Sequence, residues 1–138
     1  MLALGGLKFN LQVVLTSKMV NKILLVDDSK SDLENLKSIV VNEGYQVVTA
    51  TNGEEAVIKA KKIQPDLILM DIIMDDKDGF EACREIVADK LTKNIPIIFV
   101  TGKCEKVDRV WAELQGGKGL VGKPYTPEQI VSQINRYA

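Results

Sequence analysis

Five side chains that could take part in chemistry each stand at the end of a short apolar run of the sequence. They are Asp27, Asp28, Asp71, Thr101 and Lys123. Carboxylates that lie close together repel one another, so at neutral pH they either share a proton or bind a cation. Hard oxygen ligands without histidine or cysteine, and too few to enclose Ca²⁺, suit Mg²⁺, which keeps several of its waters. The three aspartates therefore predict a magnesium site if the fold brings them together.

The other two side chains complete a site for phosphoryl transfer. A phosphoryl group with a metal ion on one side needs a second cation and a hydroxyl on the other, which Lys123 and Thr101 can supply. Asp71, flanked by apolar residues, is the natural nucleophile for an aspartyl phosphate. Each residue alone also has an ordinary interpretation as a cap, a turn residue or a satisfied hydroxyl. Their joint occurrence favours one common site.

The apolar runs predict the strands that must position these residues. From Asn21 onward, short apolar runs alternate with amphipathic stretches. The runs are too short for helices and predict strands over residues 22–27, 46–50, 66–71, 95–101 and 120–123. The amphipathic stretches predict helices from a cap at Ser29 or Ser31 to Gly44, over residues 54–63, 80–90 and 105–115, and from Thr126 onward.

Strict alternation of strands and helices predicts a parallel sheet with helices on both faces, because each right-handed crossover needs a helix to return the chain. Ligands of such sheets bind outside the carboxyl ends of the strands, where the strand order reverses. If the strand at 46–50 lies at the edge and those at 22–27 and 66–71 are central neighbours, the three carboxylates converge. Thr101 and Lys123 then lie beside them.

The composition limits the kinds of protein that the chain can be. Its 138 residues, 46% hydrophobic and 27% charged, suit one domain with one core. A net charge of -1 gives no electrostatic footprint for nucleic acid or an anionic membrane. No apolar run approaches the roughly 18 residues of a membrane span, and the first residues lack a secretory signal pattern. We expect a cytoplasmic protein with no nucleic-acid partner and no membrane insertion.

Histidine and cysteine usage narrows the chemistry further. The chain has no histidine, and Cys83 and Cys104 lie far apart without a CxxC partner. Zinc, haem and histidine-based acid–base catalysis are therefore disfavoured. We expect both cysteines to be reduced rather than bridged.

Five sequence blocks carry a resemblance to a known family: ILLVDDS, PDLILMDIIM, DGFE, PIIFVTG and VGKPY, which begin at residues 23, 65, 78, 96 and 121. With these blocks, residues 21–138 resemble the receiver domain of bacterial two-component response regulators. The resemblance implies an α/β fold of the flavodoxin-like (βα)5 type, with a doubly wound parallel five-stranded sheet in the order 2-1-3-4-5. Residues 1–20 would be an N-terminal extension: an arm, an added strand or a non-native start, since Met19 could equally begin the protein.

The resemblance also implies how the metal is bound. Asp71 would be the phosphoacceptor and Asp28 a direct Mg²⁺ ligand. Asp27 would act through a metal-bound water, and the backbone carbonyl of Ile73 would complete the protein's share of the coordination.

The remaining roles that the resemblance implies concern the phosphoryl group and its donor. Thr101 and Lys123 would contact the phosphoryl oxygens, and the Lys123–Pro124 peptide would be cis. The donor would be a phosphohistidine on a histidine kinase or phosphotransfer protein, and the receiver would catalyse its own phosphorylation. A downstream output protein would read the result.

Several residues depart from the family pattern. Leu120 occupies a position where the family usually has Tyr or Phe, so the usual coupling of the threonine to an aromatic side chain cannot operate unaltered. Asp75 replaces a common proline. Ile73 and Lys103 flank the route by which water would attack the acyl phosphate. We expect Ile73 either to exclude that water and prolong the phosphorylated state or simply to pack on the loop.

The aromatic residues and the C-terminal third give further expectations. We favour Trp111 as a core residue, because a lone aromatic on an amphipathic helix is more often core than interface. The stretch RVWAELQGGKGLVGKP also looks similar to single-domain regulators of chemosensory systems that drive twitching or pilus-based movement.

The first hypothesis for function is a stand-alone response regulator, with no effector domain after its last helix. Magnesium-dependent phosphoryl transfer to Asp71 would switch its affinity for a partner protein, without any enzymatic role beyond its own phosphorylation and dephosphorylation. One alternative is a phosphatase or phosphotransferase that works through an aspartyl phosphate. Such hydrolases usually carry a second acid two residues after the nucleophile, where this chain has Ile73. The other alternative is a degenerate receiver-like interaction module.

Overall fold

A computed structural model describes residues 20–137 of the chain. The expected N-terminal extension, residues 1–20, falls almost entirely outside the described residues. No helix within residues 20–137 is long and apolar enough to cross a membrane.

Five parallel strands form one sheet, as the sequence predicts. They are β1 (Lys22–Val26), β2 (Gln46–Ala50), β3 (Leu67–Met70), β4 (Ile97–Thr101) and β5 (Gly119–Gly122). The strand order is β2-β1-β3-β4-β5, so the flavodoxin-like order is confirmed. In the register, Val26 at the end of β1 pairs with both Ala50 and Met70. Strands β1 and β3 therefore end at the same level, at the centre of the sheet.

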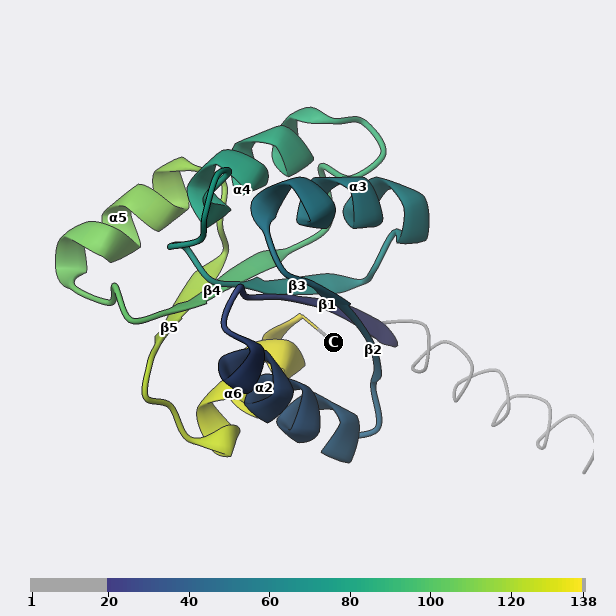
Figure 1. Ribbon diagram of the computed structural model, residues 1–138, viewed down its shortest axis with the longest axis vertical. Helices are drawn as coiled ribbons and strands as arrows, with labels where there is room; N and C mark the ends of the chain where they lie inside the picture. Colours follow the sequence, from purple (N-terminus) through teal and green to yellow (C-terminus); the bar gives the residue numbers. More distant parts are fainter. Residues whose placement is uncertain (1–19, 138) are drawn as a thin grey trace, which may run out of the picture.

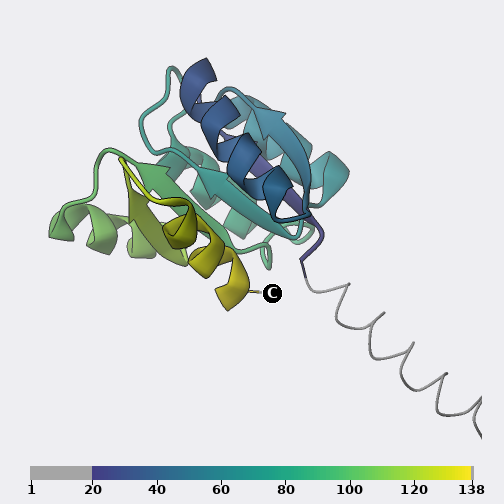
Figure 2. The ribbon, with the colours of Figure 1, turned by 90° about the horizontal axis from the view of Figure 1, so that it is seen from below.

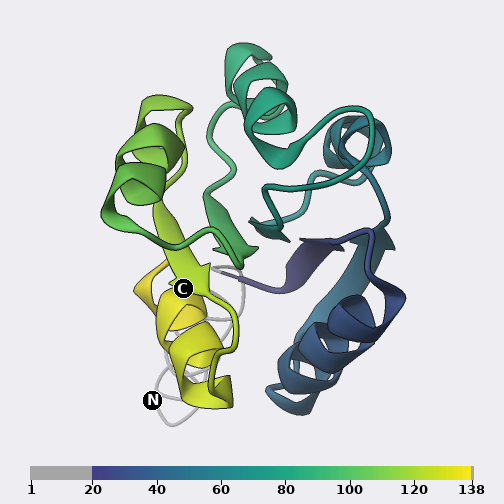
Figure 3. The same ribbon diagram turned by 60° about the vertical axis from the view of Figure 1, so that its left-hand side comes forward.

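Five helices cover the two faces of the sheet. They are α2 (Lys30–Asn42), α3 (Gly53–Ile63), α4 (Gly79–Ala88), α5 (Lys106–Leu114) and α6 (Pro127–Arg136). Helices α3, α4 and α5 lie on one face and α2 and α6 on the other (Figure 1). Figure 2 shows α2 and α6 together in front of the sheet, and Figure 3 shows the same two layers from the side.

The core consists of two apolar layers, one on each side of the sheet. In β1, Leu24 and Val26 pack with α3, α4 and α5, whereas Ile23 and Leu25 pack with α2 and α6. All four side chains are buried. A central strand that is buried on both faces must be apolar at every position, which is why β1 reads as a continuous hydrophobic run.

The helix ends follow the capping residues in the sequence. Ser29 rather than Ser31 caps α2, and its side chain accepts the N–H of Asp32. Gly44 has φ +94° and ends the segment in the left-handed conformation, as expected. At α6, Thr126 and Gln129 form a reciprocal capping box around Pro127, which confirms the predicted start.

The predicted boundaries differ from the structure at the end of α4 and at the start of β4. The helix ends at Ala88 rather than near Lys90, and the strand begins at Ile97 rather than Ile95. A turn fills the interval, held by the buried Thr92, whose hydroxyl donates to the carbonyl of Ile86 at 2.7 Å. Apolar spacing alone does not predict this turn, because the turn depends on a hydrogen bond of a polar side chain, Thr92, to the helix backbone.

The expectation that Trp111 belongs to the core is wrong, because its side chain is 52% exposed. The buried face of α5 carries Asp108 and Ala112. Asp108 accepts the N–H of Glu105 in the capping box of this helix, which fixes it on the inner side. The polar cap therefore turns the tryptophan outward.

Both cysteines are free, as expected. Cys83 is buried, and its thiol donates to the carbonyl of Gln115 at 3.3 Å. Burial raises the pKa of Cys83 to about 12. This thiol is therefore a structural group, whereas Cys104 is exposed.

A glycine at the start of α4 sets the backbone around Asp71. The N–H of Gly79 donates to the carbonyl of Ile72 at 2.7 Å. A Cβ at position 79 would overlap the Asp71 carbonyl oxygen and come within 2.9 Å of Ile72 Cα. Because the obstructing atoms belong to the backbone, they cannot move aside as a flexible side chain could.

Gly79→Ala should therefore destabilise the protein by about 1–3 kcal/mol, the usual range for overpacking a tight site. The measurement is urea denaturation followed by circular dichroism. Gly102→Ala is the matched control, since nothing lies within 4 Å of a Cβ there. Equal stability of the two variants would contradict the close approach.

Candidate functional site

The carboxyl ends of three strands bring together three of the five predicted side chains. The Lys123 ammonium, just after β5, donates to Asp27 Oδ2 at 2.7 Å and to Asp71 Oδ2 at 3.0 Å. The two aspartates directly follow β1 and β3. Residues that are 96 and 52 positions apart from Lys123 thus meet in one cluster at the edge of the sheet.

The sheet itself fixes the backbone of this cluster. The N–H of Asp27 donates to the carbonyl of Ala50 at 3.2 Å, and the N–H of Asp71 donates to that of Val26 at 3.0 Å. On the other side, the N–H of Lys123 donates to the carbonyl of Thr101 at 2.9 Å. Asp27, Asp71 and Lys123 thus each extend the hydrogen bonding between two strands by one residue. The Lys123–Pro124 peptide is cis, as the family resemblance implies.

The Asp71 carboxylate is held through both oxygens. Its Oδ1 accepts the N–H of Ile72 at 2.7 Å and that of Ile73 at 3.4 Å, while its Oδ2 accepts from Lys123. Its side chain is only 11% exposed. The carboxylate is therefore presented in one orientation at the mouth of the site. The Ile73 side chain beside it is 60% exposed.

Burial and pairing oppose each other in this cluster. Burial raises the pKa of Asp27, and the hydrogen bonds from Lys123 and from the Ser29 N–H only partly offset it. Burial alone would lower the pKa of Lys123, but hydrogen bonds to its carboxylate partners outweigh that effect and raise it. Lys123 therefore keeps its positive charge at neutral pH and neutralises the buried aspartates.

The other two predicted side chains lie at the same edge but outside this hydrogen-bonded cluster. Thr101 is buried, and its hydroxyl accepts the N–H of Lys103 at 3.3 Å. Asp28 is exposed, next to Asp27. Within residues 20–137, no hydrogen bond joins either side chain to Asp71.

A further carboxylate, missed by sequence reasoning, completes the cluster. Lys123 also donates to Asp32 Oδ2 at 2.9 Å. Asp32 lies in the first turn of α2, three residues after the Ser29 cap. One turn further along, Asn35 donates to the hydroxyl of Tyr125 at 3.2 Å. The signal in the sequence is the Ser29 cap, because a helix separated from β1 by only three residues places its first turn beside the end of that strand.

The donor set fits Mg²⁺ in its chemistry. Asp27, Asp28, Asp71 and the Ile73 carbonyl offer only oxygen atoms, and the exposed Asp28 is accessible to a hydrated ion. Within residues 20–137, no group of three acidic, histidine or cysteine side chains is arranged as a ready metal site. The Lys123 ammonium donates to Asp27, Asp71 and the nearby Asp32, and it supplies the positive charge there.

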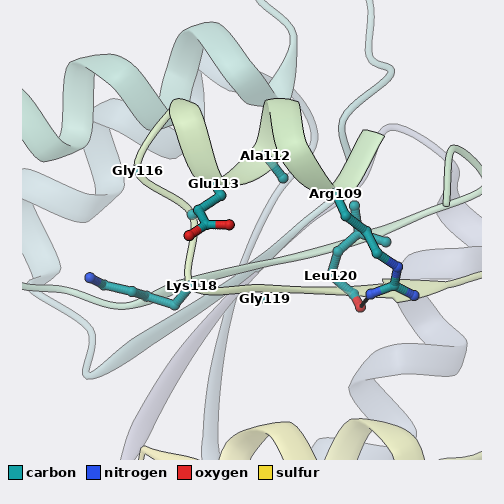
Figure 4. Close-up of a pocket in the computed structure, with 8 residues that line it drawn as sticks. Arg109, Ala112, Glu113, Gly116, Lys118, Gly119 and Leu120 are labelled. Atoms are coloured by element: carbon teal, nitrogen blue, oxygen red, sulfur yellow. Dashed lines mark hydrogen bonds between the residues drawn. The ribbon is translucent and has the colours of Figure 1, made fainter. Parts of the chain in front are cut away.

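A separate cavity lies away from the Asp27, Asp71 and Lys123 cluster. A cavity of about 400 Å³ lies between α5 and the start of β5, lined by Arg109, Glu113, Lys118 and Leu120 among others (Figure 4). None of the cluster residues lines it. Arg109 donates to the Leu120 carbonyl at 3.1 Å across its rim. Leu120 is buried and belongs to the same core layer as Phe99, so no aromatic ring stands at this position.

Comparison with known proteins agrees with this arrangement. The family described as Response regulator receiver domain matches residues 23–135. The chain is 39% identical to the protein PilH of Pseudomonas aeruginosa, over 83% of this chain and 94% of PilH. It is 35% identical to the chemotaxis protein CheY of Thermotoga maritima, over 86% of this chain and 98% of that protein.

A solved structure gives a similar result. The fold is similar to that of the receiver domain of the sensor histidine kinase PA1611 from Pseudomonas aeruginosa PAO1, which has a magnesium ion coordinated in its active-site cleft. The TM-score is 0.80 at 29% identity, over 86% of this chain and 97% of that one. The chain spans about half the length of several other curated relatives, which are transcriptional regulators.

Lys123→Met should weaken the fold, because it leaves Asp27 and Asp71 buried without a cation. At neutral pH in EDTA, we expect a loss of about 3 kcal/mol in the free energy of unfolding, as for other broken buried ion pairs. Urea denaturation measures this loss. Lys37→Met is a matched control, because Lys37 is an exposed lysine of α2.

The deficit of Lys123→Met should shrink as the pH falls toward the ordinary carboxyl range. Burial already raises the pKa of Asp27, so the folded protein binds this proton more tightly than the unfolded chain. Removing Lys123 also removes the hydrogen bond that lowers this pKa, so the pKa of Asp27 is higher still in the variant, and acid stabilises the folded variant more than the unaltered protein. A deficit of equal size in neutral and mildly acidic buffer would contradict the assignment of Lys123 as the neutralising cation.

Proposed function

Since the chain belongs to the response regulator receiver domain family, we propose that it is a cytoplasmic switch in which Asp71 accepts a phosphoryl group from a histidine kinase or phosphotransfer protein. Receiver domains are phospho-signalling modules of two-component systems rather than catalytic enzymes. The observation that carries the proposal is the position of the Asp71 carboxylate and the hydrogen bonds that hold it. Its carboxylate is buried at the end of the central strand β3 and held between two backbone N–H groups and the Lys123 ammonium.

The transfer step follows from this geometry. A carboxylate oxygen of Asp71 attacks the phosphorus of the donor phosphohistidine, and the P–N bond breaks with its electron pair left on the imidazole nitrogen. The backbone N–H groups of Ile72 and Ile73 hold the carboxylate in place. The Lys123 ammonium and the Thr101 hydroxyl would meet the phosphoryl oxygens, so that positioning and charge neutralisation carry the catalysis.

We assign the magnesium site to the same edge of the sheet. Asp28 and Asp71 would bind the ion directly, Asp27 through a water, and Ile73 through its backbone carbonyl. When bound, Mg²⁺ supplies positive charge against the phosphoryl oxygens. The solved structure of the PA1611 receiver domain, with magnesium in its cleft, supports this assignment.

The output of the switch would be a changed affinity for a partner protein. The similarity to PilH supports the resemblance of the C-terminal third to regulators of pilus-type chemosensory systems. A hydrolase based on the same aspartyl phosphate is not favoured, because Ile73 stands where such enzymes usually carry their second acid.

The central test is the labelling of Asp71. The protein should form a stoichiometric, labile acyl phosphate with Mg²⁺ and a small phosphoryl donor, detected by intact mass spectrometry. Asp71→Asn should abolish the label, whereas Asp75→Asn, in the exposed loop after β3, should retain it. Labelling of Asp71→Asn, or none in the unaltered protein, would refute the proposal.

The lifetime of the acyl phosphate tests the role of Ile73. Its exposed side chain stands next to Asp71, so we expect it to hinder the approach of water. Ile73→Asn should shorten the half-life of the phosphorylated protein severalfold, while Ile73→Val should leave it nearly unchanged. Equal half-lives for the asparagine and valine variants would leave Ile73 as a packing residue of the loop.

A further inference from the structure

Helix α5 exposes more large apolar side chains than any other element of residues 20–137. Eight such side chains are exposed in this part of the chain, and four of them lie on this nine-residue helix. Spacings of three and four residues place all four on one side of the helix. Contiguous apolar surface of this kind marks interaction sites, unlike apolar residues scattered singly. We call this set the α5 stripe: Val107, Val110, Trp111 and Leu114, which are 52–69% exposed.

The rest of the described chain does not cover this stripe. Ala112 is the one residue of α5 in the buried core layer on this side of the sheet, and the inner side of the helix also carries the buried Asp108. In Figure 1, α5 is the outermost helix of its layer, with α4 as its neighbour. The cavity beside β5 is lined by Arg109 and Glu113 but by none of the four stripe residues (Figure 4). The α5 stripe is therefore a separate surface, on a different side of the helix from that cavity.

The α5 stripe is symmetric about its own midpoint. Val107 and Leu114 lie equally far along the chain from the point between Val110 and Trp111. If a second α5 is laid antiparallel across the stripe, Val107 lies opposite Leu114 of the second copy, and Val110 lies opposite its Trp111. Each apolar side chain then meets another. The same patch can therefore serve both chains, as the interface of a twofold-symmetric dimer requires.

The charges beside the stripe select the antiparallel arrangement. Lys106 and Glu113 are exposed and seven residues apart, so they lie on the same side of the helix near its opposite ends. Neither forms an ion pair within residues 20–137. Each also stands at the end of the helix where the dipole disfavours its charge. An antiparallel copy brings Lys106 of each chain toward Glu113 of the other, whereas a parallel copy sets like charges side by side.

We propose that the α5 stripe is a self-association surface, at which two copies of this chain pack their α5 helices antiparallel. A nine-residue helix is only about 14 Å long. The interface is therefore smaller than the roughly 1,200 Å² of total buried surface that is usual for stable complexes. The dimer is accordingly weak and reversible, and it forms at high local concentration. It does not require phosphorylation of Asp71.

Sedimentation velocity of the full chain over a concentration series measures this association. The weight-average sedimentation coefficient should rise with concentration toward that of a dimer. Leu114→Gln should lower the association constant about tenfold or more, because each dimer loses two buried leucine side chains. Leu91→Gln is the matched control, since Leu91 is 63% exposed and lies outside α5. It should associate like the unaltered protein.

The fluorescence of Trp111 reports on the interface itself, because Trp111 is the single tryptophan of the chain. Its emission maximum should move to shorter wavelength as the concentration rises, since antiparallel packing removes the indole ring from water. Leu114→Gln should suppress this shift, and Leu91→Gln should retain it. Association with unchanged emission would place the contact elsewhere on the molecule and overturn the inference.

Charge reversal tests the orientation of the two helices. Lys106→Glu sets two glutamates opposite each other, Glu113→Lys sets two lysines opposite each other, and each should weaken association severalfold. Both changes suit the helix dipole, so neither should unfold α5. The double variant restores opposite charges and should associate like the unaltered protein.

Three results would overturn the inference. One is a double variant that associates as weakly as the single variants, and another is an equal loss of association in Leu114→Gln and Leu91→Gln. The third is a chain that stays monomeric at every concentration, which would leave the α5 stripe to a different protein.

Discussion

The charge balance around Lys123 is the constraint on which the site depends. A parallel sheet gathers the carboxyl ends of its strands at one edge, and here two of them end in buried aspartates, Asp27 and Asp71. Two such carboxylates repel each other and lose most of their hydration. The ammonium from the end of β5 offsets both effects with two short hydrogen bonds. Because the ammonium already donates to both aspartates, a further anionic group can bind here only if these hydrogen bonds are rearranged. A phosphorylation switch requires such a rearrangement of contacts.

The rest of the fold holds this cluster in place through close backbone contacts. Gly79 at the start of α4 lies against the carbonyl of Asp71, and Gly53 at the start of α3 lies against that of Lys77. Two helix N-termini therefore brace the loop that follows Asp71. Side chains at either position would push the loop away from the sheet. The site is thus rigid beneath Asp71 and open above it, where Asp28 and Ile73 are exposed.

The sequence predicts the part of the site that follows from strand ends. Asp27, Asp71 and Lys123 were predictable because a parallel sheet brings these positions to one edge whatever the detailed packing. Asp32 was not, since the reach of a helical side chain depends on how the helix crosses the sheet. The hydroxyl of Thr101 shows a related limit, because position at a strand end does not decide which group a side chain contacts. Trp111 shows that apolar spacing alone does not determine which side of a short helix is buried.

Leu120 makes the contacts of Lys123 more important for signalling. A switch needs an element whose contacts differ between its two states. With a buried leucine on β5, no aromatic ring can turn between an inner and an outer position there. Lys123, by contrast, already joins Asp71 to α2 through Asp32. A charge change at Asp71 therefore has a direct physical route to the α2 and α6 face, through the two hydrogen bonds of Lys123 to Asp71 and Asp32, that needs no aromatic side chain.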